Sequence, residues 1–132
     1  MSISVTVRDE TTAGVVVHSL DIQLPAETVS VEELIRSRVY QEVRELNARK
    51  SGAVHHGLVR PTEAEVVANG FRVRKTKPIQ WKPQFEKACE AFRNRQVLIV
   101  VDDRQVETLD QMIEIASGTE ISFIKLVLLV GG

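Results

Sequence analysis

Hydrophobic and polar residues alternate over two stretches near the start of the chain. Apolar side chains occupy every second position in residues 3–7, and the same period of two recurs in residues 16–24. This period is typical of strands that bury one face. Turn-forming residues, Asp9 to Gly14, separate the two stretches. The pattern therefore predicts a β-hairpin, which Pro25 closes.

A helical period replaces the alternation after residue 30. Ser30 and Glu33 form the capping-box pattern that begins many helices. Apolar residues then recur at helical spacing, at Val31, Leu34, Ile35, Val39, Val43 and Leu46. Charged residues fall between them and are expected to face water: Glu32, Arg36, Glu42, Arg44 and Glu45. We predict a helix that ends near Asn47 and lays its apolar stripe on the sheet.

Residues 48–96 are too numerous for a structureless connection in a compact domain. A second capping-box pattern and a following glycine predict a short helix over residues 63–69. Alternation predicts a short strand over residues 71–77, whose cluster of cations suits a solvated strand edge. We interpret residues 48–96 as a subdomain inserted into one domain that spans residues 1–132.

A second helix is predicted late in this insertion. Pro83 suits a first helical turn, and Trp81 is expected to pack where the helix begins. Apolar residues follow at helical spacing, at Phe85, Ala88, Cys89 and Phe92. This stripe is typical of a helix with one buried face.

The last part of the chain combines two apolar strand patterns with a glycine pair. Residues 97–101 form a short strand pattern that meets a turn at Asp102 and Asp103, and the chain returns through residues 104–106. We predict a short helical turn over residues 110–115 and a last strand over residues 121–130. That strand runs into Gly131 and Gly132, which have no side chain to bury and lose the most backbone entropy on folding. Such an end is either frayed or accessible to an enzyme.

In this order the elements resemble the ubiquitin-like β-grasp family. The shared features are the aliphatic strand with its tight turn, the basic residue Arg104 followed by Gln105 and Val106, the Thr108-Leu109 turn and a last strand ending in Gly-Gly. The resemblance implies an α+β fold, in which a mixed sheet with adjacent first and last strands clasps one helix. It extends to both halves of the chain and leaves a helical insertion between the main helix and the third strand.

The resemblance implies that the protein is a modifier and not an enzyme. Gly132, preceded by Gly131, would be adenylated by an ATP-dependent activating enzyme and conjugated to amines of target proteins. Leu128, Leu129 and Val130 would be recognised by that enzyme. Further expected partners are a conjugating enzyme and an isopeptidase-like protease. No residue follows Gly132 in the sequence, so we expect no proteolytic maturation of the tail.

Two alternatives stay open. Residues 126–130 are entirely apolar, and in this they resemble the ends of bacterial sulfur carriers such as the molybdopterin-synthase small subunit and the thiamine sulfur carrier. The chain would then end as a thiocarboxylate and use a dedicated partner with an apolar groove. The third possibility is a non-covalent β-grasp interaction module that binds through a strand edge or an apolar patch. Such a patch would lie beside Phe123 and Lys125 unless the helix predicted around residues 81–92 covers it.

Composition adds constraints on partners and location. The chain has 132 residues, 43% hydrophobic and 27% charged, with a net charge of −1. This balance gives no reason to expect nucleic acid or an anionic membrane as a partner. The single cysteine, Cys89, cannot form an internal disulfide and fits a reducing compartment. We expect a cytoplasmic protein, and the resemblance implies a prokaryotic, bacterial one.

The remaining polar residues favour structural roles, so we expect no cofactor and no metal. His55 and His56 lie without cysteine or carboxylate at metal-ligand spacing. His18 has no nucleophile in a recognisable setting and is expected to be a strand histidine. Cys89 lies on an apolar helical stripe and should behave as a small hydrophobic residue.

Overall fold

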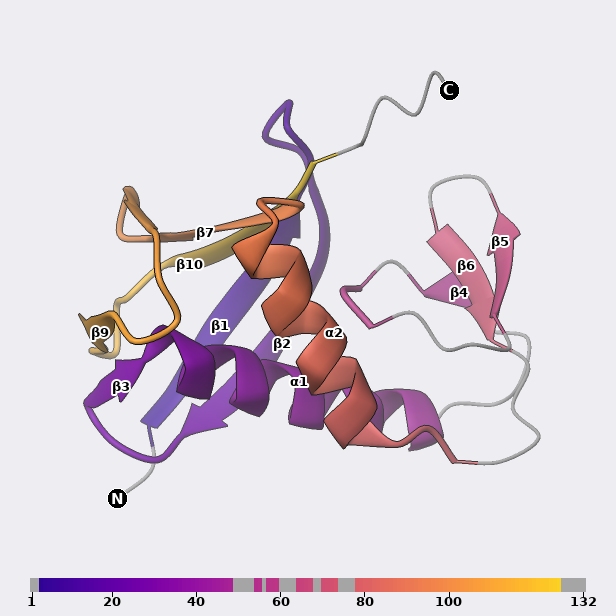
Figure 1. The fold of residues 1–132 in the computed structure, drawn as a ribbon, viewed down its shortest axis with the longest axis horizontal. Helices are drawn as coiled ribbons and strands as arrows, with labels where there is room; N and C mark the ends of the chain where they lie inside the picture. Colours follow the sequence, from indigo (N-terminus) through magenta and orange to yellow (C-terminus); the bar gives the residue numbers. More distant parts are fainter. Residues whose placement is uncertain are drawn as a thin grey trace.

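The computed structural model describes residues 3–48, 54–55, 57–59, 64–67, 70–73 and 78–126. It is an α+β fold of two helices and three sheets (Figure 1). The elements are β1 (Ile3–Glu10), β2 (Val16–Leu24), β3 (Thr28–Ser30), α1 (Val31–Ala48), β4 (Val54–His55), β5 (Ala64–Val67), β6 (Gly70–Val73), α2 (Trp81–Arg93), β7 (Val97–Val101), β8 (Arg104–Val106), β9 (Met112–Glu114) and β10 (Ile121–Lys125).

The main sheet has five strands in the order β2-β1-β10-β7-β8. Its central pair, β1 and β10, is parallel, with Val7 opposite Ile121, and the other pairs are antiparallel. The strands β1 and β10 therefore lie side by side, an adjacency that the resemblance also implies. A mixed sheet with one helix packed on it is compatible with a β-grasp-like arrangement.

The core lies between this sheet and α1. Alternate strand residues point to the helix and are fully buried, as are the apolar residues of α1. They include Val7, Ile22, Ile99, Ile121, Leu34, Ile35 and Val39. Each large aliphatic side chain contributes about 1.5–3 kcal/mol when it leaves water. The second helix, α2, packs against both α1 and β7 (Figure 1), and it adds Ala88, Cys89 and Phe92 to the same core.

Helix α1 begins where the capping pattern predicts. The Oγ atom of Ser30 accepts a hydrogen bond from the backbone N–H of Glu33 at 3.1 Å, and its hydroxyl donates to the Glu33 carboxylate at 3.4 Å. This arrangement satisfies one of the N–H groups that a helix start leaves without an intrahelical acceptor.

The helix predicted over residues 63–69 is wrong. Residues Ala64–Val67 form β5, which pairs with β6 in a three-stranded sheet of order β4-β6-β5. Two successive β-branched valines disfavour a helix, and Gly70 begins the partner strand. The predicted strand over residues 71–77 is confirmed to Val73, and residues 74–77 lie outside the described part. Among the described residues of the insertion, the helix is α2.

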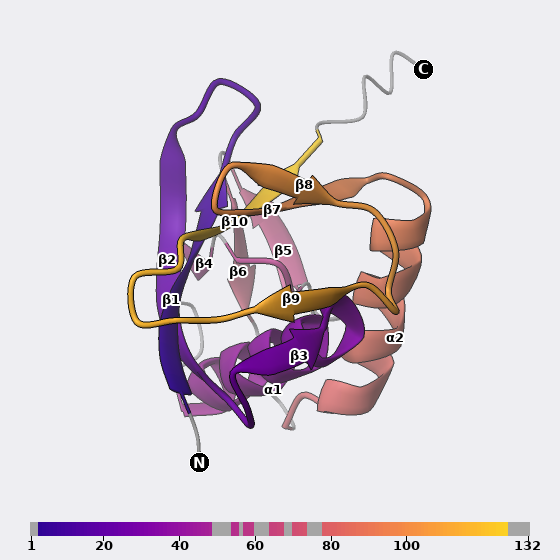
Figure 2. The same ribbon diagram turned by 90° about the vertical axis from the view of Figure 1, so that its left-hand side faces the viewer.

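The short helical turn predicted over residues 110–115 is also wrong. Residues Met112–Glu114 form β9, which pairs with β3 and places Ile113 opposite Val29 (Figure 2). Ile113 and Ile115 are buried while Met112 and Glu114 are exposed. This period of two decides the structure, because only a strand can bury both isoleucines against the core.

The last strand is described only to its midpoint. Residues 127–130 of the predicted strand lie outside the described part, and β10 ends at Lys125. Phe123 is buried, and the Arg38 guanidinium of α1 lies 4.5 Å above its ring. The sequence makes the helix around residues 81–92 a candidate to cover the apolar face at Phe123. In the structure α1 covers Phe123, and α2 packs on β7 instead. Neither described helix is long and apolar enough to cross a membrane.

A tight turn joins β7 to β8. Asp102 and Asp103 both have positive φ, 48° and 68°, and Val101 pairs with Arg104. A two-residue hairpin with positive φ at both positions is the type that matches strand twist. Asp102 also holds the start of the last strand: its Oδ1 accepts from the Glu120 N–H at 2.8 Å, and its own N–H donates to the Glu120 carbonyl at 2.9 Å.

This geometry makes the two aspartates unequal. Asp102→Ala should destabilise the protein by about 1 kcal/mol more than Asp103→Ala, because only Asp102 accepts a hydrogen bond through its side chain. Both variants place alanine at positive φ, so each controls the other for backbone strain. Urea unfolding measures the difference, and equal stabilities would show that the Asp102–Glu120 contact contributes nothing.

Candidate functional site

The site residues expected from the sequence lie at the far end of the chain. Gly131, Gly132, Leu128, Leu129 and Val130 are all outside the residues that the structure describes. The structure does describe the point from which this tail begins, at the end of β10. The geometry there decides what holds the tail to the folded body.

Two contacts fix the end of β10. The backbone N–H of Leu126 donates to the carbonyl of Gln96, just before β7, at 3.0 Å. The ammonium group of Lys125 donates to the carbonyl of Gly57, in the insertion. The last described residues are therefore attached both to the neighbouring strand and to the inserted segment.

A buried arginine lies beneath this point. Arg38 of α1 is fully buried, and its guanidinium makes a two-pronged contact with the carboxylate of Asp9 in β1. The Nη2 and Nε atoms of Arg38 also donate to Oε1 of Glu42, one turn along α1, at 2.9 and 3.2 Å. The face of the same guanidinium lies over Phe123 of β10. One side chain thus contacts α1, β1 and β10.

Glu42 extends this network into the insertion. Its carboxylate accepts from the backbone N–H of Leu58 at 3.2 Å and from that of Val59. Val59 is itself buried in the core. Glu42 and Lys125 therefore hold adjacent residues of the same inserted segment, Gly57 to Val59, from two sides.

Two carboxylates contact one guanidinium, and all three side chains are buried. Burial alone lowers the pKa of Arg38, but Glu42 and then Asp9 stabilise the charged form more strongly, so the pKa rises above its ordinary value. Because the pKa is raised in the folded state, the charged guanidinium stabilises the fold at every pH below its ordinary pKa. This contribution is lost only as the pH rises above that value. Arg38 therefore stays charged across the physiological range.

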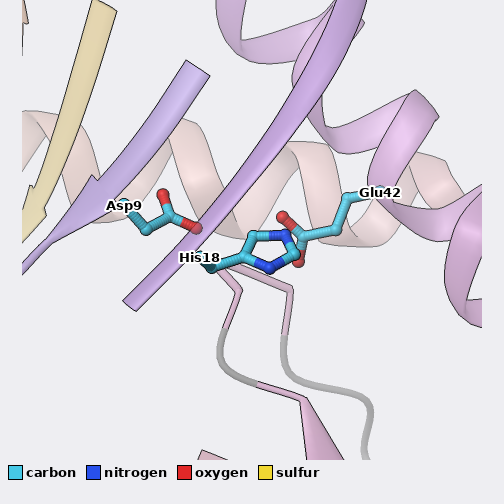
Figure 3. Close-up of side chains that lie close together, drawn as sticks. All are labelled: Asp9, His18 and Glu42. Carbon is cyan, nitrogen blue, oxygen red and sulfur yellow. The ribbon is translucent and has the colours of Figure 1, made fainter. Parts of the chain in front are cut away.

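Three of the nearby side chains could in principle hold a metal ion. Asp9, His18 and Glu42 come from β1, β2 and α1 and converge (Figure 3), with one ligand atom from each within 4.8 Å of the others. Arg38, however, already donates to both carboxylates. A divalent cation here would meet this fixed positive charge at short range. The donor set fits a guanidinium and does not support a metal site.

The sequence pattern does not predict this network. It predicts Asp9 in a turn and Glu42 on the water-facing side of the helix, and both predictions are wrong: Asp9 lies in β1, and the two residues are 2% and 0% exposed. The sequence does contain a signal for this pair: Arg38 lies four residues after Leu34 and four residues before Glu42. That spacing places the charged pair on the apolar stripe of α1.

The remaining candidate residues have structural surroundings. Cys89 is buried in α2, and burial, followed by the nearby Glu32, raises the pKa of its thiol, although Arg93 lowers it. A raised pKa keeps the thiol protonated, in agreement with the expected hydrophobic role. His55 lies in β4, and His56 is outside the described residues.

Comparison with known proteins adds no assignment. No protein-family model, no curated protein and no solved structure matches the chain.

The Arg38 network makes a sharp prediction for stability. Glu42→Gln should lower the free energy of unfolding by about 2–4 kcal/mol. It removes the negative charge beside Arg38, and it replaces one acceptor oxygen with an NH2 group that faces other N–H donors. The control is Glu45→Gln on the same helix, expected to change stability by less than about 0.5 kcal/mol. Chemical denaturation compares the two, and a Glu42 variant as stable as the control would contradict the account.

Proposed function

We propose that the protein is a β-grasp ubiquitin-like modifier whose terminal Gly132 is adenylated and joined to amines of target proteins. The single observation that supports it most is the pairing of the first and last strands. β1 and β10 lie parallel at the centre of a mixed sheet under α1, and the sequence continues from β10 into Gly131-Gly132.

The proposed chemistry uses the carboxylate of Gly132. It attacks the α-phosphate of ATP within the activating enzyme, pyrophosphate leaves, and an acyl-adenylate forms. An enzyme thiol displaces AMP to give a thioester, and a target lysine amine displaces the thiol to give an isopeptide bond. Glycine suits these steps because no Cβ obstructs the approach of the carboxylate to its partners. The proposal requires Gly132 to be the last residue of the mature protein.

The contacts at the end of β10 support such a tail. Leu126 is held by Gln96 and Lys125 by Gly57, so the body of the protein provides a fixed starting point. The six residues from 127 to 132 could span at most about 20 Å when fully extended. An activating enzyme would therefore have to bind the folded body close to this end of the sheet, where the insertion also lies.

A sulfur carrier is the second candidate. The observation that favours it is the absence of charged side chains in residues 126–130. Adenylation is the same in both cases, but sulfur would replace one carboxylate oxygen, and no target lysine would be modified. The insertion favours the modifier, because sulfur carriers resembling this chain are usually minimal domains.

A non-covalent interaction module is the candidate from another class. The observation that favours it is an exposed apolar run at the start of β2, where Val15, Val16 and Val17 are 57%, 48% and 42% exposed. β2 is one of the two outer strands of the five-stranded sheet. In this case Gly132 would be dispensable for activity.

The test expresses N-terminally tagged protein in its native host and compares wild type with a chain that lacks Gly132. Wild type should form adducts whose digests contain an isopeptide between Gly132 and a target lysine, and the shortened chain should form none. Gly118→Ala is the matched control, because an added Cβ there meets nothing within 4 Å.

Intact-mass measurement of the unconjugated protein separates the alternatives. Sulfur in place of a carboxylate oxygen would identify a carrier. Adducts that persist without Gly132, or wild-type protein with neither adducts nor a changed terminus, would contradict the modifier proposal.

A further inference from the structure

A surface groove lies on the side of α1 that faces away from the Arg38 network. Its volume is about 500 Å³. Its lining includes residues of α1, of the end of β2 and of the start of α2: Leu24, Pro25, Arg36, Tyr40, Arg44 and Trp81. This groove contains none of the residues discussed above for the tail.

Two aromatic residues, Tyr40 and Trp81, line the groove. The rings of Tyr40 and Trp81 meet edge to face with centroids 5.8 Å apart, and Trp81 contacts Phe85 at 6.2 Å. Tyr40 is 46% exposed although it contacts Trp81. Rings that are packed on one side and open on the other offer apolar area with little conformational freedom left to lose on binding.

Two arginines flank these rings. The guanidinium carbon of Arg36 lies 5.4 Å from the Trp81 ring centre, and that of Arg44 lies 5.9 Å from the Tyr40 ring centre. Arg36, Tyr40 and Arg44 are spaced four residues apart, so they lie along one face of α1. Stacking occupies the flat face of a guanidinium and leaves its N–H groups at the edge available for a carboxylate.

Neither arginine has an acidic partner in the described part of the chain. The ion pairs found there join Arg8 to Glu120 and Arg38 to Asp9 and Glu42. Glu33 also lines the groove, and its carboxylate accepts a hydrogen bond from the Ser30 hydroxyl at the helix start, at 3.4 Å. The groove thus presents two oriented cations with apolar rings between them, and this pattern is complementary to two carboxylates separated by an apolar side chain.

We propose that this groove binds an extended, acidic segment of a partner protein. Arg36 and Arg44 are eight residues apart on a helix, which is a rise of about 12 Å. In an extended peptide, side chains two residues apart share a face, and residues four apart are about 13 Å from each other. An acidic residue, an apolar residue and a second acidic residue at every other position therefore match Arg36, the ring pair and Arg44. The proposal does not depend on conjugation through Gly132.

The test uses the blocked peptide SGEVLVEGS and its neutral counterpart SGQVLVQGS, titrated into the full chain at low salt and followed by NMR. The acidic peptide should bind at least about fivefold more tightly, since it forms two exposed ion pairs. Arg36→Gln and Arg44→Gln should each weaken it about two- to fivefold. Arg104→Gln, an exposed arginine in β8 away from the groove, is the matched control and should have no effect.

A charge exchange makes the test specific to the groove. The double variant R36E/R44E should lose affinity for SGEVLVEGS and gain it for SGKVLVKGS. Equal binding of the acidic and neutral peptides would overturn the proposal, as would an equal loss with the Arg104 control. Concentration-dependent self-association that shifts Tyr40 signals and blocks the peptide would instead assign the groove to a second copy of the chain, and would also overturn it.

Discussion

One buried guanidinium holds the parts of this fold in register. Arg38 contacts β1 through Asp9, α1 through Glu42 and β10 through Phe123. Placing a charge in the interior costs several kcal/mol, and the cost is offset only when every polar atom of the charged group is satisfied. Displacing any one of these elements would leave part of the network without a partner. The constraint therefore links the first strand, the helix and the last strand.

The same constraint incorporates the insertion into the domain. Glu42 divides its carboxylate between Arg38 and the backbone of Leu58 and Val59. The contact between Lys125 and Gly57 then joins this segment to the end of β10. This segment is thus attached through polar contacts as well as through the buried side chain of Val59, next to the place where the tail starts. Any partner that binds the proposed tail would therefore lie close to both the end of β10 and this inserted segment.

Much of the fold could be predicted from the sequence, because its long elements carry strong periodic signals. The hairpin β1–β2, the capped helix α1, the helix α2 and the turn at Asp102 all follow from local patterns. The two wrong helices were short, and their structure is decided by partners elsewhere in the chain. β9 exists because it pairs with β3, and β5 because it pairs with β6. Strand preference depends on such context more than helix preference does.

The buried network illustrates a different limit. Asp9 and Arg38 are 29 residues apart in the chain, and no local pattern indicates that they meet. Helical spacing does place Arg38 and Glu42 together on the apolar stripe of α1, but it does not indicate which residues of other elements they contact. The glycine pair could be recognised from sequence alone, whereas the aromatic groove could not, because Trp81 reaches Tyr40 only through the packing of α2 on α1.

Amide hydrogen exchange at Leu58 and Val59 tests most directly whether the Arg38 network holds the insertion to the sheet. If it does, these two amides should exchange almost as slowly as the amides of β1 and β10, because they open only when the core opens. Exchange at the rate of an unfolded peptide, while β1 and β10 stay protected, would contradict the account.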